Sequence, residues 1–268
     1  MYTGFNLKCE NLLTQPQEKY YLKKGKELFK QYSNNIEEKL DELILENGNI
    51  DGEKMQANWF PTVEADIFLS HSHKNEKEAI ALSGYLYDKL GLKTFVDSCI
   101  WGYSADLLKE LDKKFCKRDD GYYDYNKRNF TTSNVHMMLS TALTKMMDKA
   151  ECLLFFNTPQ SISFKQGVKS STLSPWIYAE IEISKMLRHK KLSEYRSLRK
   201  ETRYFSKEDV QLNESIQYPV DLNHLTSINQ EDIKKWVNNY KNEEYPLDLL
   251  YYFIGKDLVF ILKKEKWL

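Results

Sequence analysis

The 268-residue sequence predicts an α/β protein, in which an open parallel sheet carries helices on both faces. Short apolar runs at 66–70, 92–96 and 152–156 are typical of strands that are buried on both faces. Amphipathic segments of helical period separate these runs. The first two runs, with a helical segment and Gly91 between them, have the spacing of a βαβ unit with parallel strands and a right-handed crossover.

Two helical segments connect the predicted strands. Residues 74–90 place Ala79, Leu82, Leu86 and Leu90 on one stripe, and Gly91 suits the position just after a helix end. Residues 134–149 form a second amphipathic helix, with a short helix near 105–115 before it. Together these elements define a main domain that we expect to span residues 61–242.

The flanks of this domain read as helical additions. Residues 1–60 are polar, with helical spacing over 18–46, and predict an extension packed on the main domain; a partner-binding arm is the alternative. Within the domain, the Tyr-rich segment 116–133 and the polar segment 157–173 read as inserted loops. The sequence further predicts a short strand at 218–222, a helix at 230–240, and a helix at 247–263 within a C-terminal unit of residues 243–268.

Composition argues against several classes of partner. Lys plus Arg and Asp plus Glu are equal, at 39 each, so net charge gives no support for binding nucleic acid or an anionic membrane. Four cysteines without a Cys-x-x-Cys pair indicate reduced thiols rather than a zinc site or disulfides. The first residues do not resemble an export signal, and no apolar run has the length of a membrane span. We therefore expect a cytoplasmic protein.

Polar and aromatic residues follow the predicted strands. Ligands of open α/β sheets bind outside the carboxyl ends of the strands, where the strand order reverses. The candidate substrate-binding residues at this rim are Ser70, His71, Ser72, Asp97, Trp101, Tyr103 and Trp176.

The segment from Ser174 to Glu180 predicts the start of a helix. Ser174 is a favourable N-cap, and Pro175 fits the first helical position, where its missing N–H costs nothing. Trp176 and Glu180 are four residues apart, so they share one face of this helix. An aromatic ring beside a carboxylate could stack on a flat ligand and stabilise a developing positive charge.

These motifs together resemble a bacterial Toll/interleukin-1 receptor (TIR) domain. The run from Asp66 to Ser72 resembles the family's first strand and loop, written D-[VI]-F-[IL]-S-[HY]-S. Residues 92–97 resemble its second strand, 100–105 its BB loop and 152–156 its third core strand. Ser174 to Glu180 resembles its S-x-W-x-x-x-E helix, although Ile177 replaces the usual Cys and the two inserted loops exceed a minimal domain.

The resemblance implies a flavodoxin-like sheet of order 2-1-3-4-5 and two classes of function. Some TIR domains bind one another as scaffolds, and others cleave the nicotinamide–ribose bond of NAD⁺ to give ADP-ribose or a cyclic isomer. Bacterial members serve in anti-phage defence, including Thoeris systems, where the product signals to an effector. For this chain the resemblance implies NAD⁺ as the substrate without a cofactor, self-association through TIR–TIR contacts, and Glu180 as the catalytic residue.

The chemistry agrees with a site of this kind. Nicotinamide leaves as a neutral molecule, so no acid is needed, and one carboxylate can stabilise the oxocarbenium-like charge on the ribose. The sequence has no P-loop, no G-x-G-x-x-G and no metal-spaced histidine cluster. A deoxyribosyltransferase-like enzyme, which also uses a carboxylate on a glycosidic bond, is a further alternative.

Each candidate also has a structural interpretation. Glu180 can be a solvated helix residue, and Trp176 can belong to the core. The segment 70–72 can be a helix cap and turn. The spacing of His71 and His73 suggests a metal site, but no third ligand lies nearby in the sequence. Trp101 and Tyr103 can stack on a base or contact a neighbouring subunit. Off the apolar stripe of its helix, His136 can be a surface residue, a cap or a site residue.

Overall fold

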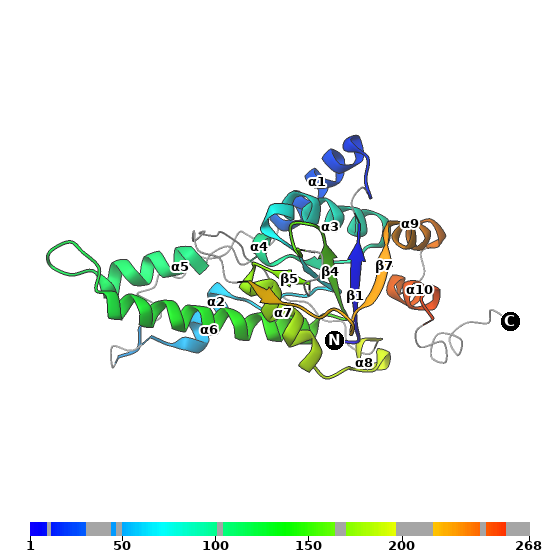
Figure 1. The fold of residues 1–268 in the computed structure, drawn as a ribbon. Helices are drawn as coiled ribbons and strands as arrows, with labels where there is room; N and C mark the ends of the chain where they lie inside the picture. Colours follow the sequence, from blue (N-terminus) through cyan, green and yellow to red (C-terminus); the bar gives the residue numbers. More distant parts are fainter. Residues whose placement is uncertain are drawn as a thin grey trace.

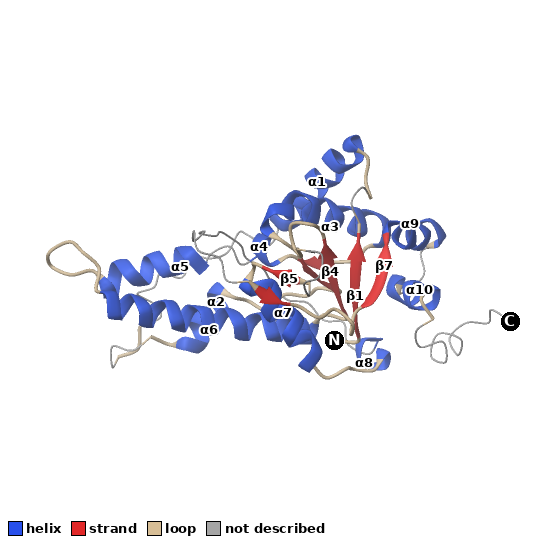
Figure 2. Ribbon diagram, viewed as in Figure 1, coloured by secondary structure: helices blue, strands red, loops and turns tan. Residues whose placement is uncertain are grey.

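The central sheet has five parallel strands (Figures 1 and 2). In this computed structural model the described residues are 1–9, 12–30, 44–46, 50–100, 104–163, 170–196, 217–241 and 245–255. The strand order is β3-β2-β4-β1-β7, and every neighbouring pair is parallel. The strands are β1 (Thr3–Lys8), β2 (Ile67–Ser70), β3 (Thr94–Phe95), β4 (Cys152–Asn157) and β7 (Thr226–Asn229). The predicted α/β class is confirmed.

Helices cover both faces of the sheet, as predicted. The helices α1 (Gln15–Lys30) and α3 (Glu76–Leu90) pack together on one face, and α6 (Tyr125–Lys149) and α7 (Pro175–Met186) lie on the other (Figure 1). Gly91 ends α3 with a left-handed φ of 67°, a conformation that glycine adopts without strain. Because α3 and α7 follow the neighbouring strands β2 and β4 on opposite faces, a crevice site between these strand ends is expected.

The prediction of a helical extension over residues 1–60 is wrong for residues 3–8. They form β1, which lies between β4 and β7 in the interior of the sheet. Counted along the chain the strand order is 3-2-4-1-5, so the order 2-1-3-4-5 is not what this sheet shows. Gly4 permits the close approach of Leu225, because a Cβ at residue 4 would lie 2.5 Å from Leu225 Cδ2. Of the helix expected over 18–46, α1 ends at Lys30, and residues 31–43 lie outside the described residues.

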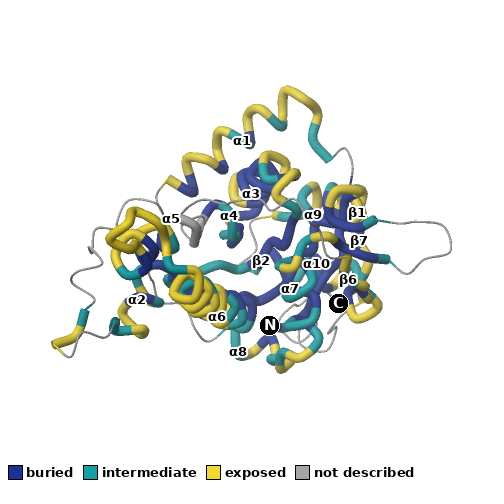
Figure 3. The backbone as a smooth tube through the Cα atoms, turned by 60° about the vertical axis from the view of Figure 1, so that its left-hand side comes forward, coloured by how far each residue is buried: buried dark blue, intermediate teal, exposed yellow. Residues whose placement is uncertain are grey.

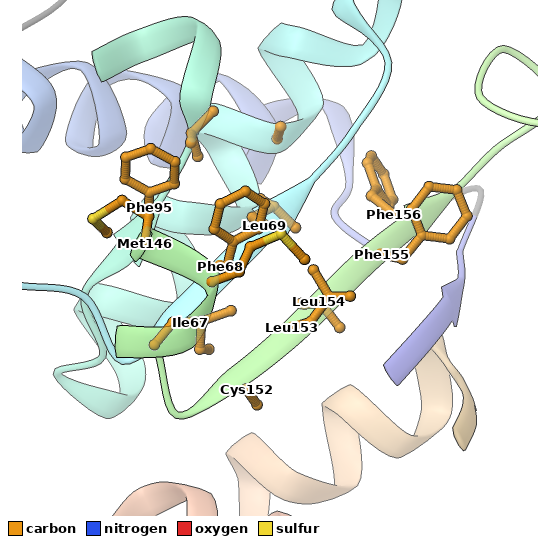
Figure 4. Close-up of a cluster of buried hydrophobic side chains, with 14 of the residues drawn as sticks. Ile67, Phe68, Leu69, Phe95, Met146, Cys152, Leu153, Leu154, Phe155 and Phe156 are labelled. Carbon is orange, nitrogen blue, oxygen red and sulfur yellow. The ribbon is translucent and has the colours of Figure 1, made fainter. Parts of the chain in front are cut away.

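The apolar runs that predicted strands form the centre of the core. Side chains of β2 and β4 alternate between the two faces and meet Phe95 of β3 and Met146 of α6 (Figure 4). Phe68 and Phe95 have ring centroids 5.1 Å apart. Burial on both faces explains why these strands read as continuous apolar runs rather than alternating ones.

The prediction of an inserted loop over 116–133 is wrong from Tyr125 onward, because α6 begins there. Asp124 caps this helix by accepting a hydrogen bond from the Lys127 N–H. Before it come α5 (Ser104–Leu111) and the π-helix η3 (Asp112–Cys116). Asp112 accepts from Arg128 Nε at 2.7 Å, which ties η3 to α6 in the helical arm that extends from the body (Figure 1).

The remaining elements surround this frame. They are α2 (Gly52–Trp59), η2 (His73–Asn75), α4 (Asp97–Ile100), β5 (Ser171–Thr172), α8 (Leu192–Arg196), β6 (Tyr218–Pro219), α9 (Gln230–Asn239) and α10 (Pro246–Phe253). The predicted helix at 230–240 is confirmed as α9. Within the predicted strand at 218–222 only β6 forms, and it pairs with β5 outside the main sheet. Of the helix predicted over 247–263, residues 256–263 lie outside the described residues.

The buried residues follow the sheet and the inner sides of the helices that flank it, whereas α6 is largely exposed along its outer side (Figure 3). Within the described part of the chain, no helix has the length and apolar character needed to cross a membrane. All four cysteines are buried and free of disulfides.

Candidate functional site

Helix α7 presents Glu180 to the sheet. Ser174 Oγ accepts the Ile177 N–H at 3.2 Å and Pro175 occupies the first turn, so the helix begins where the sequence predicts. Ile177 and Ile181 bury the inner side of the helix against the core. Glu180 lies on that same inner side, with only 2% of its surface exposed. The interpretation of Glu180 as a solvated surface residue is therefore wrong.

Ser70 at the end of β2 holds the Glu180 carboxyl group. Its Oγ donates a hydrogen bond of 2.5 Å to Glu180 Oε2, although the two residues are 110 positions apart in the sequence. The other carboxyl oxygen, Oε1, has no hydrogen-bond partner among the described residues, and it is not one of the fully buried atoms that lack a partner. One carboxyl oxygen of Glu180 is therefore held by a protein hydrogen bond, and the other can still accept one.

His71 links the end of β2 to the start of α4. Its Nε2 lies 3.1 Å from Ser98 Oγ, and its Nδ1 lies 3.5 Å from Asp97 Oδ1 without hydrogen-bond geometry. Burial lowers the pKa of His71 and outweighs the opposing effect of Asp97, so the ring is neutral at pH 7. His71 thus positions the Asp97 segment beside Ser70 rather than supplying a positive charge.

Burial also governs the ionisation of Glu180. Removal from water raises its pKa well above the usual glutamate range, and the nearby Asp97 carboxylate raises it further. The Ser70 hydrogen bond and His73 act in the opposite direction, with smaller effects. The protonated form of Glu180 is therefore favoured relative to an exposed glutamate, and a cation placed beside the carboxyl group would favour its ionised form.

Trp176 and Ser72 lie at the border of this cluster. Trp176 is half-buried against the core, and its ring meets the His136 ring edge-on with centroids 5.8 Å apart. This position is compatible with a Trp176 that packs in the core and with one that stacks on a substrate. Ser72 is half-buried at the start of η2, and its backbone carbonyl accepts the Asn75 N–H. Trp101 and Tyr103 lie outside the described residues.

Of the predicted site residues, the structure brings Ser70, His71, Asp97 and Glu180 together. They come from the end of β2, the start of α4 and the inner side of α7, at the carboxyl edge of the sheet. Sequence analysis missed Ser98 of α4, because a single serine carries no distinguishing pattern. It also missed Asn6 and Asn157, which are hydrogen-bonded at the ends of β1 and β4. The strand at 3–8 was the signal that could have located Asn6.

No three His, Cys, Asp or Glu side chains in the described ranges are grouped so that they could hold a metal ion. Comparison of the chain with protein-family models, with curated proteins and with solved structures finds no match.

Proposed function

We propose that this protein is a TIR-type enzyme that cleaves the nicotinamide–ribose bond of NAD⁺. The observation that carries the proposal is the hydrogen bond from Ser70 to the buried Glu180 at the carboxyl edge of the sheet. This pair joins two motifs that resemble the TIR family at the place where α/β sheets bind ligands. The proposal includes a flavodoxin-like TIR fold into which β1 is inserted.

The proposed reaction needs one carboxylate next to the ribose. The bond between C1′ and the pyridinium nitrogen breaks, and its electron pair leaves with nicotinamide, which becomes neutral. Glu180 stabilises the positive charge that develops on the ribose. Water then bonds to C1′ and releases one proton, giving ADP-ribose, or a nitrogen or hydroxyl of the substrate itself attacks and gives a cyclic isomer.

The ionisation of Glu180 fits a cationic substrate. The pyridinium carries a positive charge before the bond breaks, and the ribose carries it in the transition state. Both charges lower the pKa of a neighbouring carboxyl group, so substrate binding favours the carboxylate that catalysis requires. Substrate binding would thus oppose the effect of burial and of Asp97, which both raise the pKa of Glu180.

The biological setting that we propose follows the family resemblance. A cytoplasmic enzyme of this kind would act in anti-phage defence, as in Thoeris systems, assembling through TIR–TIR contacts and signalling through its product to an effector. No nucleic acid or membrane is needed as a partner.

The test is nicotinamide release from NAD⁺ by the purified protein, with Glu180→Gln as the diagnostic variant. We expect the variant to lose at least about a hundredfold in rate, as for the removal of a central electrostatic stabiliser. Glu182→Gln is the matched control, because Glu182 lies two residues away on α7 and forms a half-buried pair with Lys185 of the same helix. Full activity of a folded Glu180→Gln protein would exclude this role and favour a non-catalytic TIR scaffold. A panel of free nucleosides tests the deoxyribosyltransferase alternative.

A further inference from the structure

A second pair of polar side chains is buried at the same edge of the sheet. Asn6 of β1 and Asn157 at the end of β4 are only 6% and 7% exposed. Asn157 Nδ2 donates a hydrogen bond of 2.9 Å to Asn6 Oδ1. Neither residue has a place in the proposed chemistry described above, and their mutual hydrogen bond uses only part of the donor and acceptor capacity of the two amides.

This pair leaves one donor group and one acceptor group unused. The reciprocal bond, from Asn6 Nδ2 to Asn157 Oδ1, does not form between these two residues. No other described residue bonds to Asn6 Nδ2 or Asn157 Oδ1. Neither atom is among the fully buried polar atoms that lack a partner, so both can be reached by a bound molecule that offers the matching groups. The matching molecule has an acceptor for Asn6 Nδ2 and a donor for Asn157 Oδ1.

Strand register places the pair on the same face as Ser70. Asn6 and Ser70 are both paired with Phe155 of β4, so all three lie in one row across the sheet. Adjacent strands are about 4.8 Å apart, which puts the Ser70 and Asn6 Cα atoms about 10 Å apart. Asn157 is two residues beyond Phe155 and shares its face. Because Ser70 bonds to Glu180, this is the face that α7 covers.

We propose that Asn6 and Asn157 bind the carboxamide of the nicotinamide ring, an inference that rests on the proposed function. A primary carboxamide offers a carbonyl acceptor for Asn6 Nδ2 and an N–H donor for Asn157 Oδ1. The edge of adenine offers the same two kinds of group. The shared row with Ser70, the partner of Glu180, favours nicotinamide, because its ring is bonded directly to the ribose carbon on which Glu180 acts, whereas adenine lies at the far end of the dinucleotide.

The test compares NAD⁺ with its 3-acetylpyridine analogue, in which a methyl ketone keeps the carbonyl acceptor and lacks the N–H donor. We expect Asn157→Ala to reduce the preference for NAD⁺ over this analogue, measured as the ratio of kcat/KM values, by about tenfold, the worth of one hydrogen bond to a buried group. Asn157→Asp keeps an acceptor oxygen for the substrate N–H but loses the donor to Asn6 Oδ1, so it should retain the preference while kcat/KM falls for both substrates. Asn6→Asp removes the donor to the carbonyl that both substrates share, so it should weaken both equally.

Two results would overturn the assignment. One is an unchanged preference in an Asn157→Ala protein that still cleaves NAD⁺. The other is a change seen only with the hypoxanthine analogue of NAD⁺, which would assign the pair to adenine.

Binding of free nicotinamide, measured by saturation-transfer NMR, gives a readout that does not depend on turnover. If wild type binds nicotinamide and Asn157→Ala does not, the inference holds even when NAD⁺ is not cleaved, and only the proposed function fails. If Asn157→Ala binds nicotinamide as wild type does, the inference is wrong.

Discussion

Glu180 is buried beneath α7 with a single hydrogen bond from Ser70, so its carboxylate form is costly in the unliganded protein. A surface glutamate on the same helix would be ionised at all physiological pH values. A carboxyl group whose pKa is strongly shifted by burial is typical of functional sites, where activity and stability can make opposite demands. Substitution of Glu180 tests the effect on stability, and substitution of Ser70 tests the effect on activity.

We expect Glu180→Gln to stabilise the protein relative to wild type increasingly as pH rises. The raised pKa means that folded Glu180 keeps its proton where the unfolded chain has released it, so the folded state binds more protons. Wild-type stability therefore falls as pH rises from the unfolded glutamate value of about 4.3 toward the higher folded value. Glutamine does not titrate and avoids this loss. Calorimetric melting temperatures at pH 5 and pH 8 provide the measurement, and an equal difference at both values would contradict the expectation.

Ser70→Ala should shift the pH dependence of nicotinamide release to higher pH. The Ser70 hydroxyl stabilises the Glu180 carboxylate, so its removal raises the pKa of Glu180 further and leaves less carboxylate at neutral pH. Hydrogen bonds to charged groups contribute about 1.5–3 kcal/mol, which corresponds to a loss of about tenfold or more at pH 7. Ser133→Ala is a control, because Ser133 is an exposed hydroxyl bonded to its own helix at Asn129. A pH profile that keeps its midpoint would show that Ser70 has no such role.

At the level of elements, α1 and α3 contact each other through their backbones. A Cβ at Gly84 of α3 would lie 2.2 Å from the Tyr21 carbonyl oxygen, and a Cβ at Gly25 of α1 would lie 2.2 Å from the Ile80 carbonyl oxygen. Glycine usually weakens a helix interior, but here it permits a packing distance that no other residue allows. This contact attaches the segment after β1 to the first helix of the βαβ unit.

Gly84→Ala should reduce the free energy of unfolding by about 1–3 kcal/mol, because both helices must move apart to admit the methyl group. Gly52→Ala is the matched control, since nothing lies within 4 Å of a Cβ at that position in α2. Urea denaturation of the two variants distinguishes them. Equal stability of both proteins would mean that the α1–α3 contact adapts without cost.

At the level of the whole molecule, a buried ionic network joins the C-terminal helices to the sheet. Arg196 at the end of α8 donates to both oxygens of Glu151, which precedes β4, and to Asp248 of α10. Tyr251 of α10 also donates to Glu151 at 2.9 Å. Despite its burial, Arg196 has its pKa raised by these carboxylates, so it stays charged. The network thereby holds α8 and α10 against the amino end of β4, although these segments are distant in the sequence.

Arg196→Met should lower the free energy of unfolding by about 3–5 kcal/mol, because it leaves two carboxylates without their cation. Arg188→Ala removes an exposed pair with Glu194 and should cost less than about 1 kcal/mol. Thermal unfolding of both proteins gives the comparison. A loss of less than about 1 kcal/mol for Arg196→Met would show that the network orients the helices without stabilising the fold.

Elements with local signals were predicted well from the sequence. Ser174 and Pro175 define the start of α7, Gly91 ends α3, and the apolar runs locate β2 and β4, because capping, left-handed φ and burial on two faces each select particular residue types. The segment Thr3–Lys8 was missed because it is short and contains Gly4 and Asn6, which strands disfavour. It becomes a strand by pairing with β4 and β7, far along the chain.

The sequence by itself determined the α/β class, the α7 helix and the residue types at the carboxyl ends of the strands, since these depend on neighbouring residues. Only the tertiary structure decided that Ser70 meets Glu180, that His71 lies beside Asp97, and that Asn6 pairs with Asn157. It also decided the ionisation of Glu180, which burial controls. Contacts between distant segments and removal from water arise only when the chain packs, so no local pattern encodes them.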